Sequence, residues 1–187
     1  MRIRRIFRPS LAARLRLPLA VAACLGISAA LIPAALPGGL SGASGPPRVV
    51  SVPAAEVRVL DGGTLRLGAQ VLRLEALRVP DRGRAACRDA AGGAQDCGSA
   101  AAAALAALVA GRDLACRVRS EDRQGRATGT CEAGGVEINA SLVAAGWALA
   151  DAGAAPGLLA LEATARQDGR GVWGAASPTA ETWRRGL

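Results

Sequence analysis

The chain has 187 residues, 51% of them hydrophobic, which allows one domain of ordinary size plus an appendage. Its formal net charge is +8, but six arginines lie within residues 1–16, where there is no acidic residue, so the 17 arginines from Arg48 onward face 15 acidic residues, a net of +2. The isoelectric point of the whole chain is therefore no evidence for nucleic-acid binding. Only local clusters of arginines remain as candidate binding sites.

The N-terminal region predicts export. Residues 1–16 are basic, and residues 17–36 carry no charge over a length that is sufficient to cross a bilayer as a helix. Arginines on the N-terminal side predict that the remainder lies outside the cytoplasm. We expect an uncleaved membrane anchor, a signal cleaved near Ser41, or lipidation of Cys24. The domain is then held in the cell envelope by one inner-membrane span, or is periplasmic or secreted after cleavage.

The remainder of the chain divides into a linker and a folded domain. Residues 37–50 are rich in Gly, Pro and Ser, so we expect a flexible linker there and the domain at residues 51–187. The cysteines of this domain are Cys87, Cys97, Cys116 and Cys131. Export makes disulfides their expected state, with three possible pairings. A zinc site is not expected, because the chain has no histidine and no Cys-x-x-Cys pair.

Short patterned segments follow one another in the domain. Two hairpins are expected, one around Gly68-Ala69 and one around the polar turn at residues 121–126. Ser99 and Asn139 can cap helices, and a third helix precedes the sequence GRGVWG. The expected strands are residues 48–59, 64–67, 71–77, 113–119 and 127–131, and the expected helices are residues 99–110, 139–146 and 158–167. This order favours an α+β fold with a small Greek-key barrel over a parallel α/β sheet.

The second hairpin predicts one disulfide. A hairpin centred between residues 123 and 124 places Cys116 directly opposite Cys131, because paired positions in a regular antiparallel hairpin have a constant sum. A directly opposed pair is within reach of a disulfide. Cys87 and Cys97 then pair by elimination.

Five motifs in chain order make the domain similar to the staphylococcal nuclease, or thermonuclease, family. They are VLDGGTLRL, VLRLEALRVPD, DRQGR, INASLVAAGWAL and GRGVWG, and the resemblance extends from Val57 to Arg184. It implies an OB-fold, a five-stranded β-barrel with about three helices. In the enzymes of the family it also implies calcium-dependent hydrolysis of nucleic-acid phosphodiesters.

The carboxylates that the resemblance requires for calcium are replaced. Gly63 and Arg78 stand where the family has two aspartates, and the shorter Asp81 stands where it has a glutamate that orients water. Because calcium needs several oxygen ligands and Arg78 would repel it, we expect no metal. Asp61 remains as a candidate ligand or, more simply, as a turn residue. We also expect that Gly63→Asp with Arg78→Asp would restore calcium binding, since the other residues around the expected metal site are kept.

The resemblance implies that two phosphate-contacting arginines are retained. Arg73 and Arg126 stand at the family's positions, and guanidinium groups bind phosphate oxygens through paired hydrogen bonds. We expect an anion site of Arg73, Arg126 and Arg78, although Arg126 can instead pair with Asp122 in the turn. If the domain is active, Arg73, Asp81 and Arg126 are the expected catalytic residues.

Three functions remain open from the sequence. The first is an exported, membrane-tethered member of the family that hydrolyses poorly and binds an anion, a nucleic acid or nucleotide, or an unknown protein partner. The alternative is an active metal-dependent endonuclease with calcium held by Asp61, Asp81 and Glu75. The third is a structural envelope module whose cleft has no role. Gln124 replaces the family's tyrosine, so we expect any nucleic-acid binding to be weak, because base stacking is a main source of single-strand affinity.

Overall fold

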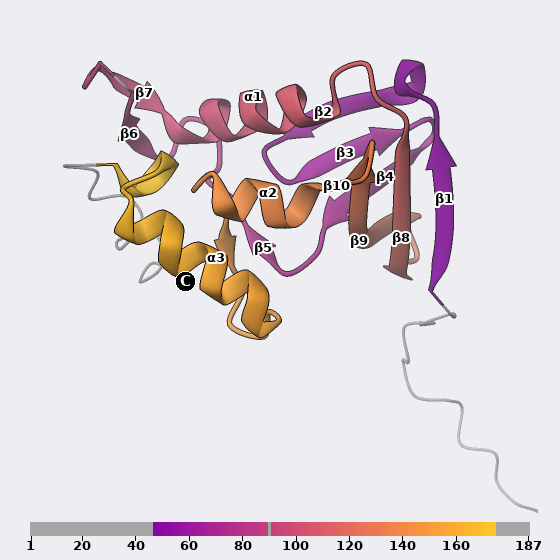
Figure 1. Ribbon diagram of the computed structural model, residues 1–187. Coiled ribbons are helices and arrows are strands. Elements are labelled where there is room, and N and C mark those ends of the chain that lie inside the picture. The colour runs from indigo at the N-terminus through magenta and orange to yellow at the C-terminus, as the bar shows by residue number, and fades with distance from the viewer. Residues whose placement is uncertain (1–46, 90, 175–187) are drawn as a thin grey trace, which may run out of the picture. The chain divides into compact units, whose positions relative to one another are not determined.

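The computed structural model describes residues 47–89 and 91–174 (Figure 1). These residues belong to the second of two compact units, which comprises residues 39–187. The expected basic region, the uncharged segment at residues 17–36 and most of the linker lie outside the described residues. Among the helices that the structure describes, none combines the length and the apolar character that a membrane span requires.

In the part of the chain that the structure describes, the largest of three sheets has seven strands and organises the domain. Its strands are β1 (Arg48–Val52), β2 (Val57–Asp61), β3 (Thr64–Leu67), β4 (Gln70–Leu74), β8 (Leu114–Glu121), β9 (Arg126–Ala133) and β10 (Val136–Glu137). They lie in the order β1, β8, β9, β4, β3 and β2, and β10 pairs with β9. Strands β4 and β9 are parallel, which brings the two predicted hairpins together in one mixed sheet (Figure 1).

Two small sheets accompany the large one. They consist of β5 (Leu77–Arg78) with β11 (Leu149–Ala150), and of β6 (Ala86–Arg88) with β7 (Ala94–Asp96). The predicted strand at residues 71–77 is therefore two elements, because Ala76, with a φ of +58°, turns the chain between β4 and β5. This turn carries β5 away from the large sheet to β11.

The large sheet curls into a half-barrel around its buried alternate side chains, which fits the predicted OB-fold of the α+β class. Leu65, Leu72 and Leu114 are almost completely buried on the inner face. One predicted strand, residues 48–59, is interrupted by Pro53 and a 3-10 turn, η1 (Ala54–Glu56). Proline has no N–H to donate to a strand ladder, so β1 pairs with β8 and β2 with β3.

Three helices complete the fold, as predicted: α1 (Cys97–Val109), α2 (Ile138–Ala144) and α3 (Pro156–Gln167). All three begin one or two residues earlier than expected, and carboxylates cap the first two. Asp96 accepts a hydrogen bond from the backbone N–H of Ser99, and Glu137 accepts one from that of Asn139. Helix α1 contacts β2, and α2 contacts α3 and β9.

The β8–β9 hairpin carries the predicted disulfide. Cys116 and Cys131 are directly opposed, with an S–S distance of 2.07 Å and a Cα–Cα distance of 4.1 Å. Both cysteines are buried in the main core. The disulfide thus joins the two longest strands inside the half-barrel.

The second predicted bridge is not formed, and Cys87 and Cys97 are buried free thiols. The register of β6 and β7 places Gln95 opposite Cys87, and Cys97 lies two residues farther along. Such diagonal neighbours have Cα atoms about 7 to 8 Å apart, which is farther than most disulfides span. The two thiols still form a hydrogen bond and share a small core cluster with Leu149 and Val172.

Candidate functional site

Arg73 lies on the outward face of the sheet between two threonines. Thr64 of β3 is opposite Arg73 of β4, and Arg73 is in register with Thr128 of β9. Its chain neighbours Leu72 and Leu74 are buried, so the two-residue alternation of a strand directs Arg73 to the surface. Within residues 47–89 and 91–174, Arg73 makes no ion pair and no side-chain hydrogen bond. No side chain in the described part of the chain therefore competes with an external anion for its guanidinium.

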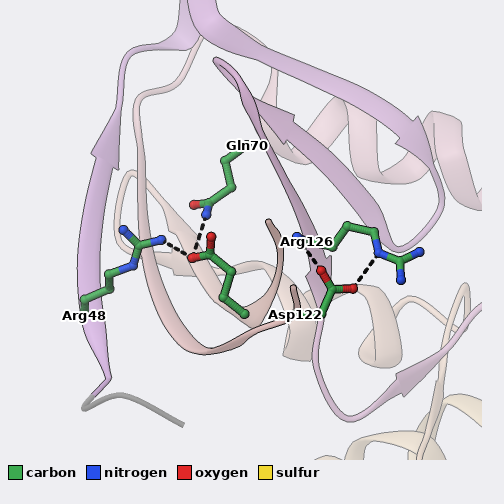
Figure 2. Close-up of polar contacts among 5 residues, drawn as sticks. Arg48, Gln70, Asp122 and Arg126 are labelled. Carbon is green, nitrogen blue, oxygen red and sulfur yellow. Dashed lines mark hydrogen bonds and ion pairs between the residues drawn. The ribbon is translucent and has the colours of Figure 1, made fainter. Parts of the chain in front are cut away.

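Arg126 begins β9 and pairs with Asp122 in the hairpin turn (Figure 2). Arg126 Nε donates a hydrogen bond of 2.6 Å to Asp122 Oδ2, while Asp122 Oδ1 accepts bonds of 2.9 Å from the backbone N–H groups of Gln124 and Arg126. These hydrogen bonds, above all that from the backbone N–H of Arg126, hold the pKa of Asp122 below its ordinary value. The turn role expected as the alternative for Arg126 is present, yet 69% of its side chain remains exposed.

A cavity of about 520 Å³ brings Arg73 and Arg126 together. The other lining residues are Thr64, Val71, Ser120, Glu121, Asp122, Ala127 and Thr128. Two guanidinium groups and three hydroxyl groups are the kinds of donor that bind phosphate oxygens. Glu121 and Asp122 reduce the positive charge, so the local cluster is balanced rather than strongly cationic.

Both carboxylates of the cavity already have partners. Asp122 pairs with Arg126, and Glu121 Oε2 accepts hydrogen bonds from Arg48 Nη2 at 2.6 Å and Gln70 Nε2 at 3.1 Å (Figure 2). Exposed ion pairs of this kind contribute at most about 1 kcal/mol, so they direct side chains more than they stabilise the fold. Neither carboxylate is bonded to Arg73, so the positive charge of its guanidinium is not balanced by them and can attract an anionic ligand.

Sequence reasoning did not identify Arg48, Glu121 or Thr128 as residues of this region. The contact between Arg48 and Glu121 joins positions 73 residues apart and leaves no local pattern. Thr128 lies in a strand that was predicted, but its place beside Arg73 depends on the parallel pairing of β4 with β9. Only knowledge of that pairing would have found it.

The turn at Gly62 and Gly63 has no space for a metal-binding side chain. A Cβ atom on Gly63 would lie 2.3 Å from Val79 Cγ2, and one on Gly62 would lie 2.7 Å from Ala101 Cβ. Asp61 Oδ1 accepts a hydrogen bond of 2.8 Å from the backbone N–H of Gly63, which is the turn role expected for this aspartate. Apolar groups thus occupy the place where an aspartate side chain would begin.

Arg78 is not among the residues that line the cavity of Arg73 and Arg126. It lies in β5, where its Nε is 3.2 Å from Asp151 Oδ1 without the geometry of a hydrogen bond. Only 27% of its side chain is exposed, and its charge is balanced by this carboxylate. The expected grouping of three arginines is therefore reduced to two.

The remaining candidate carboxylates do not gather. Glu75 Oε1 pairs with Arg119 Nε at 3.0 Å, and Asp81 lies exposed after β5. Among the residues that the structure describes, no three acidic or cysteine side chains are placed so as to hold a metal ion. Calcium requires six to eight oxygen ligands, so the donor set and the space at Gly63 do not fit it.

Comparison with known families gives a match over part of the chain. The sequence matches the family described as Staphylococcal nuclease homologue over residues 72–175, more than half of the chain. This region includes Arg73, Arg126 and all three helices, and it begins after the turn at Gly63. No curated protein matches the chain significantly.

Proposed function

Because the chain belongs to the staphylococcal nuclease homologue family, we propose that it binds phosphate-bearing anions, nucleic acid among them, and has little or no metal-dependent hydrolysis. The observation that carries this proposal is the contact between Gly63 and Val79, which leaves no place for a carboxylate at the expected metal position. Phosphodiester hydrolysis by this family's chemistry needs a hard cation held by carboxylates.

The binding part of the proposal rests on Arg73 and its surroundings. Arg73 has no acidic partner in the described part of the chain, and the hydroxyl groups of Thr64 and Thr128 flank it in the strand register. Arg126 lines the same cavity and is exposed beside it. An anion bound there would receive charge-assisted hydrogen bonds without having to displace a carboxylate from Arg73.

We place the domain outside the cytoplasm, tethered through residues 17–36 or released after cleavage. The uncharged segment following basic residues supports this placement. The disulfide between Cys116 and Cys131 also supports it, because disulfides persist mainly in oxidising compartments.

The two arginines also favour a second candidate, an active metal-dependent endonuclease. Arg73 and Arg126 would stabilise the charge that builds on phosphate in the transition state. This candidate requires Asp61, Asp81 and Glu75 to come together around a metal. Glu75 would have to leave Arg119, and Asp61 would have to leave the backbone of Gly63.

One experiment separates the two candidates. A labelled oligothymidylate is mixed with the purified domain in EDTA, and binding is followed by anisotropy. Cleavage is then assayed with calcium, magnesium or manganese. The proposal expects binding in EDTA that is lost in the Arg73→Gln, Arg126→Gln double variant, and no cleavage with any metal. Metal-dependent cleavage above the EDTA control would establish the endonuclease, and absence of both binding and cleavage in every buffer would refute both candidates.

A further inference from the structure

A row of arginines extends from the phosphate cavity across the outward face of the sheet. Arg58 of β2 is directly opposite Arg66 of β3, Arg66 is opposite Val71 of β4, and Val71 is in register with Arg126 of β9. The three arginines are exposed, whereas neighbours such as Leu67 are buried. The row therefore spans four adjacent strands, with arginines on β2, β3 and β9 and Val71 between them on β4, and Asp122 balances Arg126 at one end.

The opposition of Arg58 and Arg66 is unfavourable for the folded protein alone. Like charges directly opposite each other on adjacent strands destabilise a sheet, since their Cβ atoms are only about 4.5 to 5.5 Å apart. Arg66 makes no ion pair and no side-chain hydrogen bond within the described ranges. Arg58 is held by bonds of 2.8 Å from its Nη1 to the carbonyl oxygens of Ala55 and Val57, and these bring no negative charge. Packing and stability give no reason for this pair.

We propose that Arg58 and Arg66 extend the binding site of Arg73 and Arg126 into a track for the phosphate backbone of a single nucleic-acid strand. The inference rests on the proposed function and names its ligand. Three strand steps separate β2 from β9, so the row is about 14 Å long. A free phosphate would occupy only the cavity, whereas a row of this length matches a linear polyanion.

The track binds the negative charge of the phosphate backbone and does not distinguish one base from another. The two tryptophans of the described chain, Trp147 and Trp173, pack against the small core cluster of Cys87 and Cys97 and do not lie on β2, β3, β4 or β9. The residues that the structure describes therefore place no aromatic ring on these strands, and they offer no platform for base stacking there. Binding should therefore depend steeply on salt and should be nearly equal for oligothymidylate and oligoadenylate.

The salt dependence of oligothymidylate binding tests the track. For single strands the slope of log K against log salt concentration is about −0.7 for each phosphate contact. Arg66→Gln and Arg58→Gln should each make the slope shallower by about 0.7, and the double variant by about 1.4. Arg112→Gln is the matched control, because Arg112 is an exposed arginine after α1 whose guanidinium, within the described residues, donates a hydrogen bond to Leu108 O and makes no ion pair. Its slope should equal that of the wild type.

The possible results distinguish this inference from the proposed function. Absence of binding by the wild type would refute the proposed function itself. Binding that is lost in the Arg73→Gln, Arg126→Gln variant but unchanged in Arg58→Gln, Arg66→Gln would refute only the track. If Arg58→Gln, Arg66→Gln lost binding to phosphatidylserine vesicles while its binding to oligothymidylate was unchanged, the row would be a membrane-binding surface. That result would also overturn the nucleic-acid track. Thermal unfolding checks that each variant is folded, and Arg66→Gln should unfold at or above the wild-type temperature, because it removes a like-charge contact.

Discussion

Val79 lies against the backbone of Gly63, so closely that a Cβ atom on this glycine would be 2.3 Å from Val79 Cγ2. Real Cβ atoms do not approach a methyl group to that distance, so the two residues fit only as a pair. Gly63 is not in the left-handed region, which means that space rather than backbone conformation requires the glycine. The absence of one carboxylate is thus coupled to a second residue that fills the same place.

We expect Gly63→Ala to destabilise the domain by about 1 to 3 kcal/mol, the usual cost of inserting a methyl group into a packed site. The matched control is Gly153→Ala, since Gly153 has open space around its Cβ position and no left-handed conformation. That change should be neutral or stabilising by up to about 1 kcal/mol. Denaturant unfolding measures both. Val79→Ala should recover part of the loss at Gly63, and strict additivity of the two changes would show that the contact is not the cause.

The structure also changes the expectation for calcium. Gly63→Asp with Arg78→Asp should not restore binding, because Val79 blocks the new side chain and Asp151 would face a second carboxylate in place of its arginine. Adding Val79→Ala is the minimum further change that makes room. We expect calcium to leave the melting temperature of the wild type and of the double variant unchanged. A bound ligand at a hundred times its Kd would instead raise the free energy of unfolding by about 2.7 kcal/mol, and the melting temperature with it. Calcium binding by the wild type in calorimetry would contradict this and favour the endonuclease.

The hairpin shows how far the sequence could predict the fold. From Leu114 to Val118 the paired positions follow the predicted sum, which sets Cys116 opposite Cys131. Nearer the turn the register shifts by one residue at a bulge between Val118 and Ser120. The turn is therefore centred on one residue, Gln124, rather than between two, and the bulge compensates for the difference. Local patterns determine such strand pairs, but not a bulge in them.

The site was less predictable than the fold because its geometry depends on long-range contacts. The motifs identified Arg73, Arg126 and the loss of carboxylates at Gly63 and Arg78. They did not indicate that Arg78 lies against Asp151, because that contact follows from the pairing of β5 with β11. The type of residue at a motif position indicated its chemistry. The direction of its side chain depends on the tertiary structure and could not be predicted from the motif.

The hydrogen bonds of the turn at Asp122 lead us to expect a measurably lowered pKa for this carboxyl group. Hydrogen bonds from the backbone of Arg126, then from its side chain, then from the backbone of Gln124 stabilise the charged carboxylate and lower its pKa. A lowered folded-state pKa gives stability that is present above the ordinary value of about 3.9 and is lost as the pH falls through the folded value. Carbon-detected NMR should find the pKa of Asp122 below that of a model peptide. In Arg126→Gln the pKa should rise only in part, since the backbone donor remains; a full return to the ordinary value would assign the effect to the guanidinium alone.

The free cysteines predict a difference in reactivity between two pairs. Burial, and then the hydrogen bond with Cys87, raise the pKa of the Cys97 thiol, so the nucleophilic thiolate is scarce in the folded state. We expect iodoacetamide to leave Cys97 unmodified in the native protein and to label both Cys87 and Cys97 once the chain is unfolded in denaturant. Cys116 and Cys131 should be labelled only after reduction, which makes them the internal control. Peptide mapping of unreduced protein reads all four positions together, and a peptide in which Cys87 is joined to Cys97 would show that the diagonal pair can close after all.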